Sequence, residues 1–263
     1  QRLAAEAFRS DACFFLVNGS TSGIHIMMMS AFRPGEKVIL PRNCHKSVWD
    51  GLVLSGALPV YLPPEYDAQR GLATHVSPEA VKQAVAEHPE ARGMVLTSPD
   101  YYGMCPRLAE IRRILDKRDM RMLVDEAHGA HLIFHPGLPP SAAECGADLW
   151  VQSAHKTLPA LTQAAYLQAR LAPGGPGGCD GSGGCGGQED NEGCRDGESR
   201  KNSGDTRRPV DMHRIARVHR MLQSTSPSYL LMASLDWARG YMEEQDRAIE
   251  LWGEGFDWPD KKR

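Results

Sequence analysis

The sequence predicts an α/β protein built around a mainly parallel sheet. Short apolar runs of strand length alternate along the chain with longer stretches of helical pattern. Two of these runs, at residues 122–124 and 149–152, are followed directly by polar and charged residues. In an open α/β sheet, ligands bind outside the carboxyl ends of the strands. The same pattern therefore predicts the fold class and the edge of the sheet at which a site lies.

The predicted strands are short apolar runs bounded by glycine, proline or polar residues. They cover residues 13–17, 37–40, 58–62, 94–97, 122–124, 149–152 and 162–167. Because helices separate most of them, right-handed crossovers between parallel strands are expected. We expect the loop at residues 63–76 to cross the edge of the predicted site.

The predicted helices carry an apolar stripe or a recognisable start. They cover residues 2–9, 24–32, 47–56, 78–87, 108–117, 212–222 and 230–251. Ser77 and Pro78 supply the N-cap and the N1 proline of one helix. Leu108, Ile111 and Leu115 mark the apolar face of another, which would pack on the sheet.

Composition excludes several classes of protein. The chain has 263 residues and a formal net charge of −3, which does not indicate a nucleic-acid or membrane partner. No apolar run approaches the roughly 18 residues of a membrane span. The chain begins at Gln1 inside a predicted helix, so we expect a partial chain whose targeting segments would lie outside it. Four cysteines scattered through the α/β part are typical of a reduced, cytoplasmic protein.

Composition also divides the chain into three parts. Residues 1–171 are predicted to form the α/β domain, and residues 209–263 its helical continuation and the start of a truncated C-terminal region. Residues 172–208 hold many glycines and charged residues and few apolar ones, which predicts a disordered insertion. Three further cysteines lie there without a CxxC pair, so we predict no metal site.

An acid and a lysine follow different strands at the predicted edge. Asp125 follows the run at 122–124, and Lys156 follows the run at 149–152. Such a pair could be an ordinary ion pair at a strand edge. It could also serve pyridoxal phosphate (PLP), because a carboxylate keeps a pyridine nitrogen protonated and a lysine forms a Schiff base with an aldehyde. The spacing alone leaves both interpretations open.

The turn at residues 18–23 also has two interpretations. Ser20, Thr21 and Ser22 lie between a predicted strand and a predicted helix. Backbone N–H groups and the helix dipole suit a phosphate at such a place. Serine and threonine are equally the preferred N-caps of ordinary helices.

Six motifs appear in the order found in one family. They are NGSTSG at 18–23, PRNCHKS at 41–47, SPDYYG at 98–103, DEAHGAH at 125–131, QSAHKTLPALTQ at 152–163 and LQSTSPSY at 222–229. The chain resembles the PLP-dependent ornithine/lysine/arginine decarboxylases over residues 1–171 and 209–245. The resemblance implies the large domain of fold type I, the aspartate-aminotransferase fold, with a seven-stranded sheet and helices on both faces. The family's smaller C-terminal domain is largely missing, and Asp100 stands where most relatives have threonine.

The resemblance assigns the chemistry to a few residues. Lys156 would hold PLP as a Schiff base, Asp125 would pair with the pyridine nitrogen, and His45 would stack on the ring. Ala127 would lie against the other face of the ring. His128 would contact the ring substituents or the substrate carboxylate.

Further cofactor contacts are implied at the phosphate end. Ser20, Thr21 and Ser22 become phosphate ligands under the resemblance. Ser153 and His155 become additional phosphate or ring contacts beside the lysine.

The implied reaction is decarboxylation of arginine, lysine or ornithine to the corresponding amine and CO₂. The sequence does not separate the three substrates. Thr225 and Ser226 would reach the cofactor of a neighbouring subunit, which implies a homodimer or a higher homo-oligomer. The alternatives are another PLP enzyme of fold type I, such as an aminotransferase or a lyase, and an inactive truncated homologue.

Overall fold

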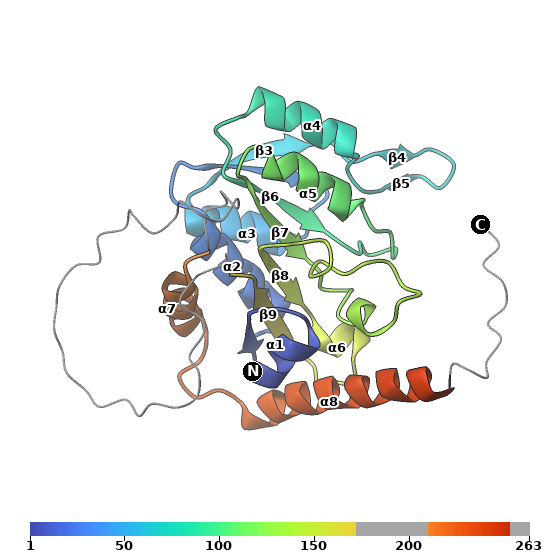
Figure 1. Cartoon of the computed structure of the whole chain (residues 1–263). Helices are drawn as coiled ribbons and strands as arrows, with labels where there is room; N and C mark the ends of the chain where they lie inside the picture. Colours follow the sequence, from blue (N-terminus) through green and yellow to red (C-terminus); the bar gives the residue numbers. More distant parts are fainter. Residues whose placement is uncertain (172–209, 253–263) are drawn as a thin grey trace, which may run out of the picture.

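The framework of the structure is a seven-stranded sheet with the order β1-β9-β8-β7-β6-β2-β3 (Figure 1). The structure is a computed structural model that describes residues 1–171 and 210–252. The strands of the sheet are β1 (Ala12–Leu16), β2 (Lys37–Pro41), β3 (Leu58–Leu62), β6 (Gly93–Thr97), β7 (Arg121–Asp125), β8 (Leu149–Gln152) and β9 (Ala165–Ala169). Strand β9 runs antiparallel to its neighbours β1 and β8, and the remaining neighbours pair in parallel. The predicted mainly parallel sheet is confirmed.

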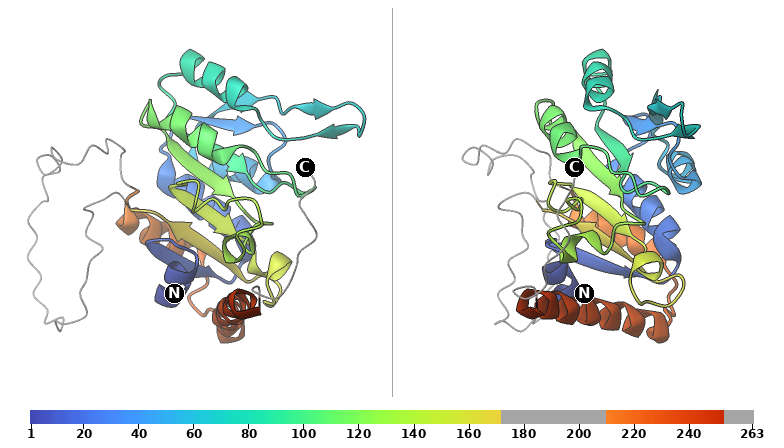
Figure 2. Two further views of the ribbon diagram at one scale, coloured as in Figure 1. Left: turned by 45° about the vertical axis from the view of Figure 1, so that its right-hand side comes forward. Right: turned by 90° about the vertical axis from the view of Figure 1, so that its right-hand side faces the viewer.

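Helices cover both faces of this sheet (Figure 2). They are α1 (Arg2–Ala7), α2 (Gly19–Ala31), α3 (Lys46–Ser55), α4 (Pro78–Glu87), α5 (Leu108–Asp116), α6 (Ala154–Thr157), α7 (Met212–Leu222) and α8 (Tyr229–Trp252). Helices α2, α3 and α7 share one apolar cluster with the sheet, and α1, α4, α5 and α8 share the other. The prediction of helices on both faces is therefore confirmed.

The central strands are apolar along their middle residues because both of their faces are covered. Met122, Leu123 and Val124 of β7 are all fully buried. Their side chains alternate between the faces, so Met122 and Val124 join the cluster of α5 while Leu123 joins the cluster of α2. A continuous apolar run of this kind is what the sequence showed at residues 122–124.

Helix α2 lies close against the sheet because Gly23 has no side chain. A Cβ atom at this position would lie 2.6 Å from Leu16 Cδ1 and 2.8 Å from Val151 Cγ1. The close approach fixes the start of α2 over the carboxyl ends of β1 and β8.

Two predicted boundaries were wrong, and one predicted loop contains additional structure. Helix α2 begins at Gly19 rather than at residue 24. The prediction missed its first turn because that turn is polar and carries no apolar stripe. Strand β9 begins at Ala165 rather than at residue 162, because the left-handed backbone of Gln163 ends the preceding turn. The loop at 63–76 contains a short hairpin of β4 (Tyr66–Asp67) and β5 (Leu72–Ala73).

The predicted disordered insertion at 172–208 lies outside the described residues, with the three cysteines that it contains. The end of the predicted C-terminal part, residues 253–263, lies outside them as well. Within the described chain, no helix combines the length and the apolar character needed to cross a bilayer.

Candidate active site

A cavity of about 190 Å³ opens at the carboxyl edge of the parallel strands. The ends of β2, β6 and β7 meet there, together with the starts of α2 and α3, helix α6 and the loop that contains β4 and β5. Its lining residues are Ser20, Pro41, Asn43, His45, Thr74, His75, Val76, Leu96, Thr97, Asp100, Tyr101, Pro106, Asp125, Ala127, His128 and Lys156. The structure thus brings together six of the predicted site residues from four separate segments of the sequence: Ser20, His45, Asp125, Ala127, His128 and Lys156.

Asp125 is the last residue of β7 and is only 4 % exposed. Its Oδ1 accepts a hydrogen bond from the backbone N–H of Ala127 at 3.2 Å. Burial raises the pKa of Asp125, while this hydrogen bond and the electrostatic interactions with His45 and Lys156 oppose the rise. An ionised carboxylate at this position is therefore best stabilised by a cation inside the cavity.

Lys156 reaches the cavity from the short helix α6, directly after β8. Its Nζ lies 3.2 Å from Nε2 of His128. Burial, followed by the charge of Lys156, lowers the pKa of His128. The imidazole is therefore neutral near pH 7, and its Nε2 can accept a hydrogen bond from the lysine ammonium.

His45 is held in place by its position at the start of α3. It is the N-cap of this helix, and its Nδ1 accepts from the backbone N–H of Ser47 at 3.2 Å. The Oγ of Ser47 lies 2.8 Å from the same nitrogen. These contacts orient the imidazole, which lines the cavity, and the sequence motif alone could not show them.

Ser20 lies in the first turn of α2, where backbone N–H groups lack partners within the helix. The side chain of Asn18, the N-cap residue, makes no capping hydrogen bond. The hydroxyl of Ser153 donates to the hydroxyl of Ser20 at 2.7 Å, so two hydroxyl groups meet beside these amides. The arrangement suits an anion at the positive end of the helix dipole.

Four predicted cofactor contacts do not line the cavity: Thr21, Ser22, Ser153 and His155. Ser153 is fully buried and meets the cavity only through its hydrogen bond to Ser20. The hydroxyl of Ser22 donates to the carbonyl of Gly19 at 2.9 Å and accepts from Gln223 at 3.0 Å. Thr21 is exposed outside the cavity. The ring of His155 turns away, with Nδ1 3.0 Å from the carbonyl of Ala164.

The sequence did not single out several lining residues. Asn43, Thr74, His75, Val76 and Thr97 come from strand ends and from the loop at 63–76, which was expected at the site edge without named residues. Within the described chain, Thr97 Oγ1 and His75 Nδ1 are buried without a hydrogen-bond partner. The position of Thr97 directly at the end of an apolar strand is the sequence feature that could have indicated this residue.

Glu126, the neighbour of Asp125, is fully buried on the other side of the strand end. Its two carboxyl oxygens accept from the backbone N–H of Ala142 at 2.6 Å and from Gln152 Nε2 at 2.7 Å. Gln152 is linked in turn to Gln168 at 3.3 Å. Burial raises the pKa of Glu126 to about 8. Below about pH 8 the carboxyl group is therefore protonated, and through Gln152 it joins the ends of β7 and β8.

Replacement of Glu126 by glutamine is expected to flatten the pH dependence of stability. An ordinary glutamate ionises near pH 4.5, whereas folding keeps Glu126 protonated up to about pH 8. The free energy of unfolding of the wild-type chain should therefore fall by a few kcal/mol as pH rises through this window. Urea unfolding at several pH values would measure the free energy of unfolding of the wild type and the variant. The control is Glu79→Gln, at an exposed position, which should keep the pH dependence of the wild type. If the free energy of unfolding of Glu126→Gln falls with pH as steeply as that of the wild type, Glu126 is not the group with the raised pKa.

The fold is that of the PLP-dependent enzymes of fold type I. The solved lysine decarboxylase LdcF of Francisella novicida is similar to this chain with a TM-score of 0.67 and 21 % identity, covering 99 % of this chain and 36 % of that one. The family model described as Orn/Lys/Arg decarboxylase, major domain, matches residues 1–255. The chain belongs to this family.

Two curated relatives support the membership. The uncharacterized protein YaaO of Bacillus subtilis is 41 % identical over 92 % of this chain and 43 % of its own length. The arginine decarboxylase of Halalkalibacterium halodurans is 39 % identical over 95 % of this chain and 43 % of its own length. The chain thus spans less than half the length of these relatives.

Proposed function

We propose that the chain binds PLP in this cavity and takes part in the decarboxylation of a basic amino acid. The observation that carries the proposal is the meeting of a buried carboxylate, Asp125, and a reachable amine, Lys156, in one cavity. Membership of the Orn/Lys/Arg decarboxylase family supports the same chemistry. The arginine decarboxylase name of the relative from H. halodurans supports a basic substrate.

The residues present fit PLP. The buried carboxylate of Asp125 has a single described hydrogen bond, from Ala127, and would be stabilised by a protonated pyridine nitrogen. The buried hydroxyl of Thr97 has no partner among the described residues and lies at the same cavity. The first turn of α2 with Ser20 offers amide and hydroxyl donors to a phosphate group.

Each side chain has a role in this proposal. Lys156 would hold the cofactor covalently, and Asp125 would keep its ring nitrogen protonated. His45 would stack on the ring, and Ala127 leaves room on the other face. When bound, PLP supplies an electron sink for the pair left on the α-carbon as CO₂ departs. Lys156, whose Nζ lies 3.2 Å from Nε2 of His128, would return a proton to that carbon.

The phosphate would lie at the start of α2, against Ser20 and Ser153. Their hydroxyls already meet at 2.7 Å. The backbone of Thr21 and Ser22 belongs to the same helical turn, so these residues would contribute through their amides more than through their hydroxyls. His155 would act on the position of Lys156 through its contact with Ala164.

A second subunit would complete the site. Thr225 and Ser226 are exposed in the segment between α7 and α8, where Ser226 N–H donates to Ser224 Oγ at 3.1 Å. In a homodimer this hydroxyl-rich segment would reach the cofactor of the partner. Analytical ultracentrifugation of the chain tests this part, since a monomer at working concentration would contradict it.

The proposal as a whole is tested by adding PLP to the purified chain. We expect a visible absorbance band that borohydride fixes to the protein, followed by release of labelled CO₂ from arginine, lysine or ornithine. Absence of the band would mean that the cavity does not hold PLP. A band without CO₂ release from any of the three amino acids would instead indicate a different reaction.

A further inference from the structure

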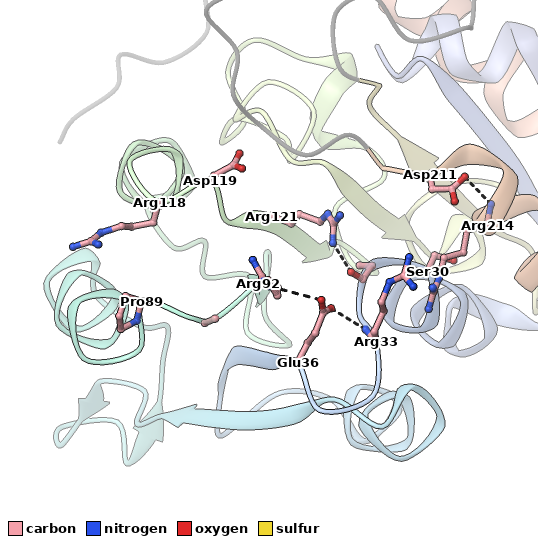
Figure 3. Close-up of a pocket in the computed structure, with 12 residues that line it drawn as sticks. Ser30, Arg33, Glu36, Pro89, Arg92, Arg118, Asp119, Arg121, Asp211 and Arg214 are labelled. Carbon is pink, nitrogen blue, oxygen red and sulfur yellow. Dashed lines mark hydrogen bonds and ion pairs between the residues drawn. The ribbon is translucent and has the colours of Figure 1, made fainter. Parts of the chain in front are cut away.

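A second, larger cavity lies at the opposite edge of the sheet (Figure 3). Its volume is about 380 Å³. It is lined where β2, β6 and β7 begin, at Glu36, Arg92 and Arg121, whereas the candidate active site lies where these strands end. The end of α2 and the start of α7 close its other side. Helix α2 thus runs from one cavity to the other, and the two sites are separate.

Arginines dominate this second cavity. We call it the arginine basin, defined by the five arginines that line it: Arg33, Arg92, Arg118, Arg121 and Arg214. Three acidic residues also line it: Glu36, Asp119 and Asp211. The side chains that line the basin therefore have a positive formal net charge, whereas the whole chain has a formal net charge of −3.

Two of the acidic groups are already engaged within the protein. Glu36 Oε2 accepts from the backbone N–H of Arg33 at 2.9 Å, and its Oε1 lies 3.7 Å from Arg92 Nε. Asp211 is the N-cap of α7 and accepts from the backbone N–H of Arg214 at 3.1 Å. Glu36 therefore offsets part of the charge of Arg92, while the carboxylate of Asp211 is engaged at the start of α7.

Two of the arginines are held rigidly. Arg214 donates from Nε and Nη2 to the carbonyl of Met29 at 3.0 and 2.7 Å, and from Nη2 to that of Phe32 at 3.0 Å. Arg121 donates from Nη1 to the carbonyl of Ala31. They satisfy carbonyl groups at the end of α2, which a helix cannot satisfy itself. Their guanidinium groups are consequently fixed before any ligand arrives.

Other groups are free to bind. Among the described residues, the guanidinium of Arg33 makes no hydrogen bond or ion pair, and the side chain is exposed. Ser30 lines the basin with only 7 % of its surface exposed, and its Oγ has no hydrogen-bond partner within the described chain. A buried hydroxyl without a partner next to several arginines indicates a ligand that accepts hydrogen bonds.

We propose that the arginine basin binds a small anion with two or more phosphoryl groups. Guanidinium groups recognise phosphate oxygens through paired, charge-assisted hydrogen bonds. In Figure 3, Arg33, Arg92 and Arg121 surround one opening from separate elements, while Arg118 points away from it. Several donors from different directions, in a cavity wider than one phosphate group, suit a diphosphate better than a single carboxylate. The proposal does not depend on the chemistry of the other cavity.

The test is isothermal titration calorimetry of the full chain, preincubated with PLP, with inorganic pyrophosphate as the probe. We expect one equivalent to bind, more tightly than inorganic phosphate, and less tightly as salt rises. Arg33→Gln and Arg92→Gln should each weaken binding about tenfold or more, the effect of one lost charge-assisted contact. Both side chains are exposed and neither caps a helix, so the fold should be retained. The matched control is Arg113→Gln, an exposed arginine of α5 outside the basin.

Three results would overturn the proposal: no binding, binding unchanged in Arg33→Gln and Arg92→Gln, or equal weakening in Arg113→Gln, which would show general electrostatic attraction. Equal affinity for phosphate and pyrophosphate would overturn the assignment to a diphosphate. Lys156→Ala separates the two sites. Pyrophosphate binding that persists in this variant and is lost in Arg33→Gln belongs to the basin, whether or not the chain takes up PLP.

Discussion

Lys156→Ala is expected to abolish borohydride-fixed PLP and to lower the rate of decarboxylation by roughly 10²- to 10⁴-fold, the range of a lost acid–base group. The side chain is exposed to the cavity, and its one described hydrogen bond is to His128. Its removal should therefore leave the free energy of unfolding almost unchanged. Loss of function with retained stability is the result that distinguishes a chemical role from a structural one.

The control for this prediction is Lys82→Ala, an exposed lysine of α4 that does not line the cavity. It removes the same charge and should keep both PLP and activity. Mass spectrometry after borohydride treatment measures the covalent attachment directly. If Lys156→Ala still carries reduced PLP at the wild-type level, another amine holds the cofactor and the proposed assignment is wrong.

Asp125→Asn is expected to change activity and stability in opposite directions. Without the carboxylate the ring nitrogen would lose its partner, and kcat/KM should fall by about 10²- to 10³-fold, as for other lost electrostatic contacts in active sites. Burial raises the pKa of Asp125 above its ordinary value, so its contribution to stability is present at low pH and is lost as pH rises. The neutral amide should thus make the PLP-free variant more stable than the wild type near neutral pH.

Urea unfolding of the PLP-free chains and steady-state kinetics with PLP measure these two effects. Asp50→Asn, at an exposed position of α3, is the matched control and should alter neither. A variant that is both less stable and inactive would point to a structural role for the Asp125 carboxylate. Full activity of Asp125→Asn would contradict its proposed pairing with the ring nitrogen.

Much of the fold could be predicted because its strands are buried on both faces. A run such as residues 122–124 is apolar throughout for that reason, and its position along the chain is visible without any knowledge of its neighbours. The predicted ends of helices and strands were less accurate where the local sequence has no clear apolar pattern. The polar first turn of α2 contains Ser20, and only its packing over the sheet at Gly23 marks it as helix.

The principal residues of the candidate site were also predictable, since the ends of parallel strands share one edge. Asp125, Lys156, His45 and Ser20 each follow or precede a recognisable strand or lie in a motif of the family, and all four line the cavity. The direction of an individual side chain was not predictable. His155 lies beside Lys156 in the sequence, yet its ring contacts a backbone carbonyl outside the cavity.

The sequence by itself determined the fold class, the family and the edge of the sheet that carries the candidate site, because periodicity and motifs are local properties of the chain. Only the tertiary structure decided which distant residues meet. Glu126 acquires its raised pKa from burial where β7 and β8 end. The arginine basin gathers residues from 33 to 214 at the other edge. Neither the environment of Glu126 nor the arginine basin is visible as a local sequence pattern. Strand order and helix packing bring the residues of each together from distant parts of the chain.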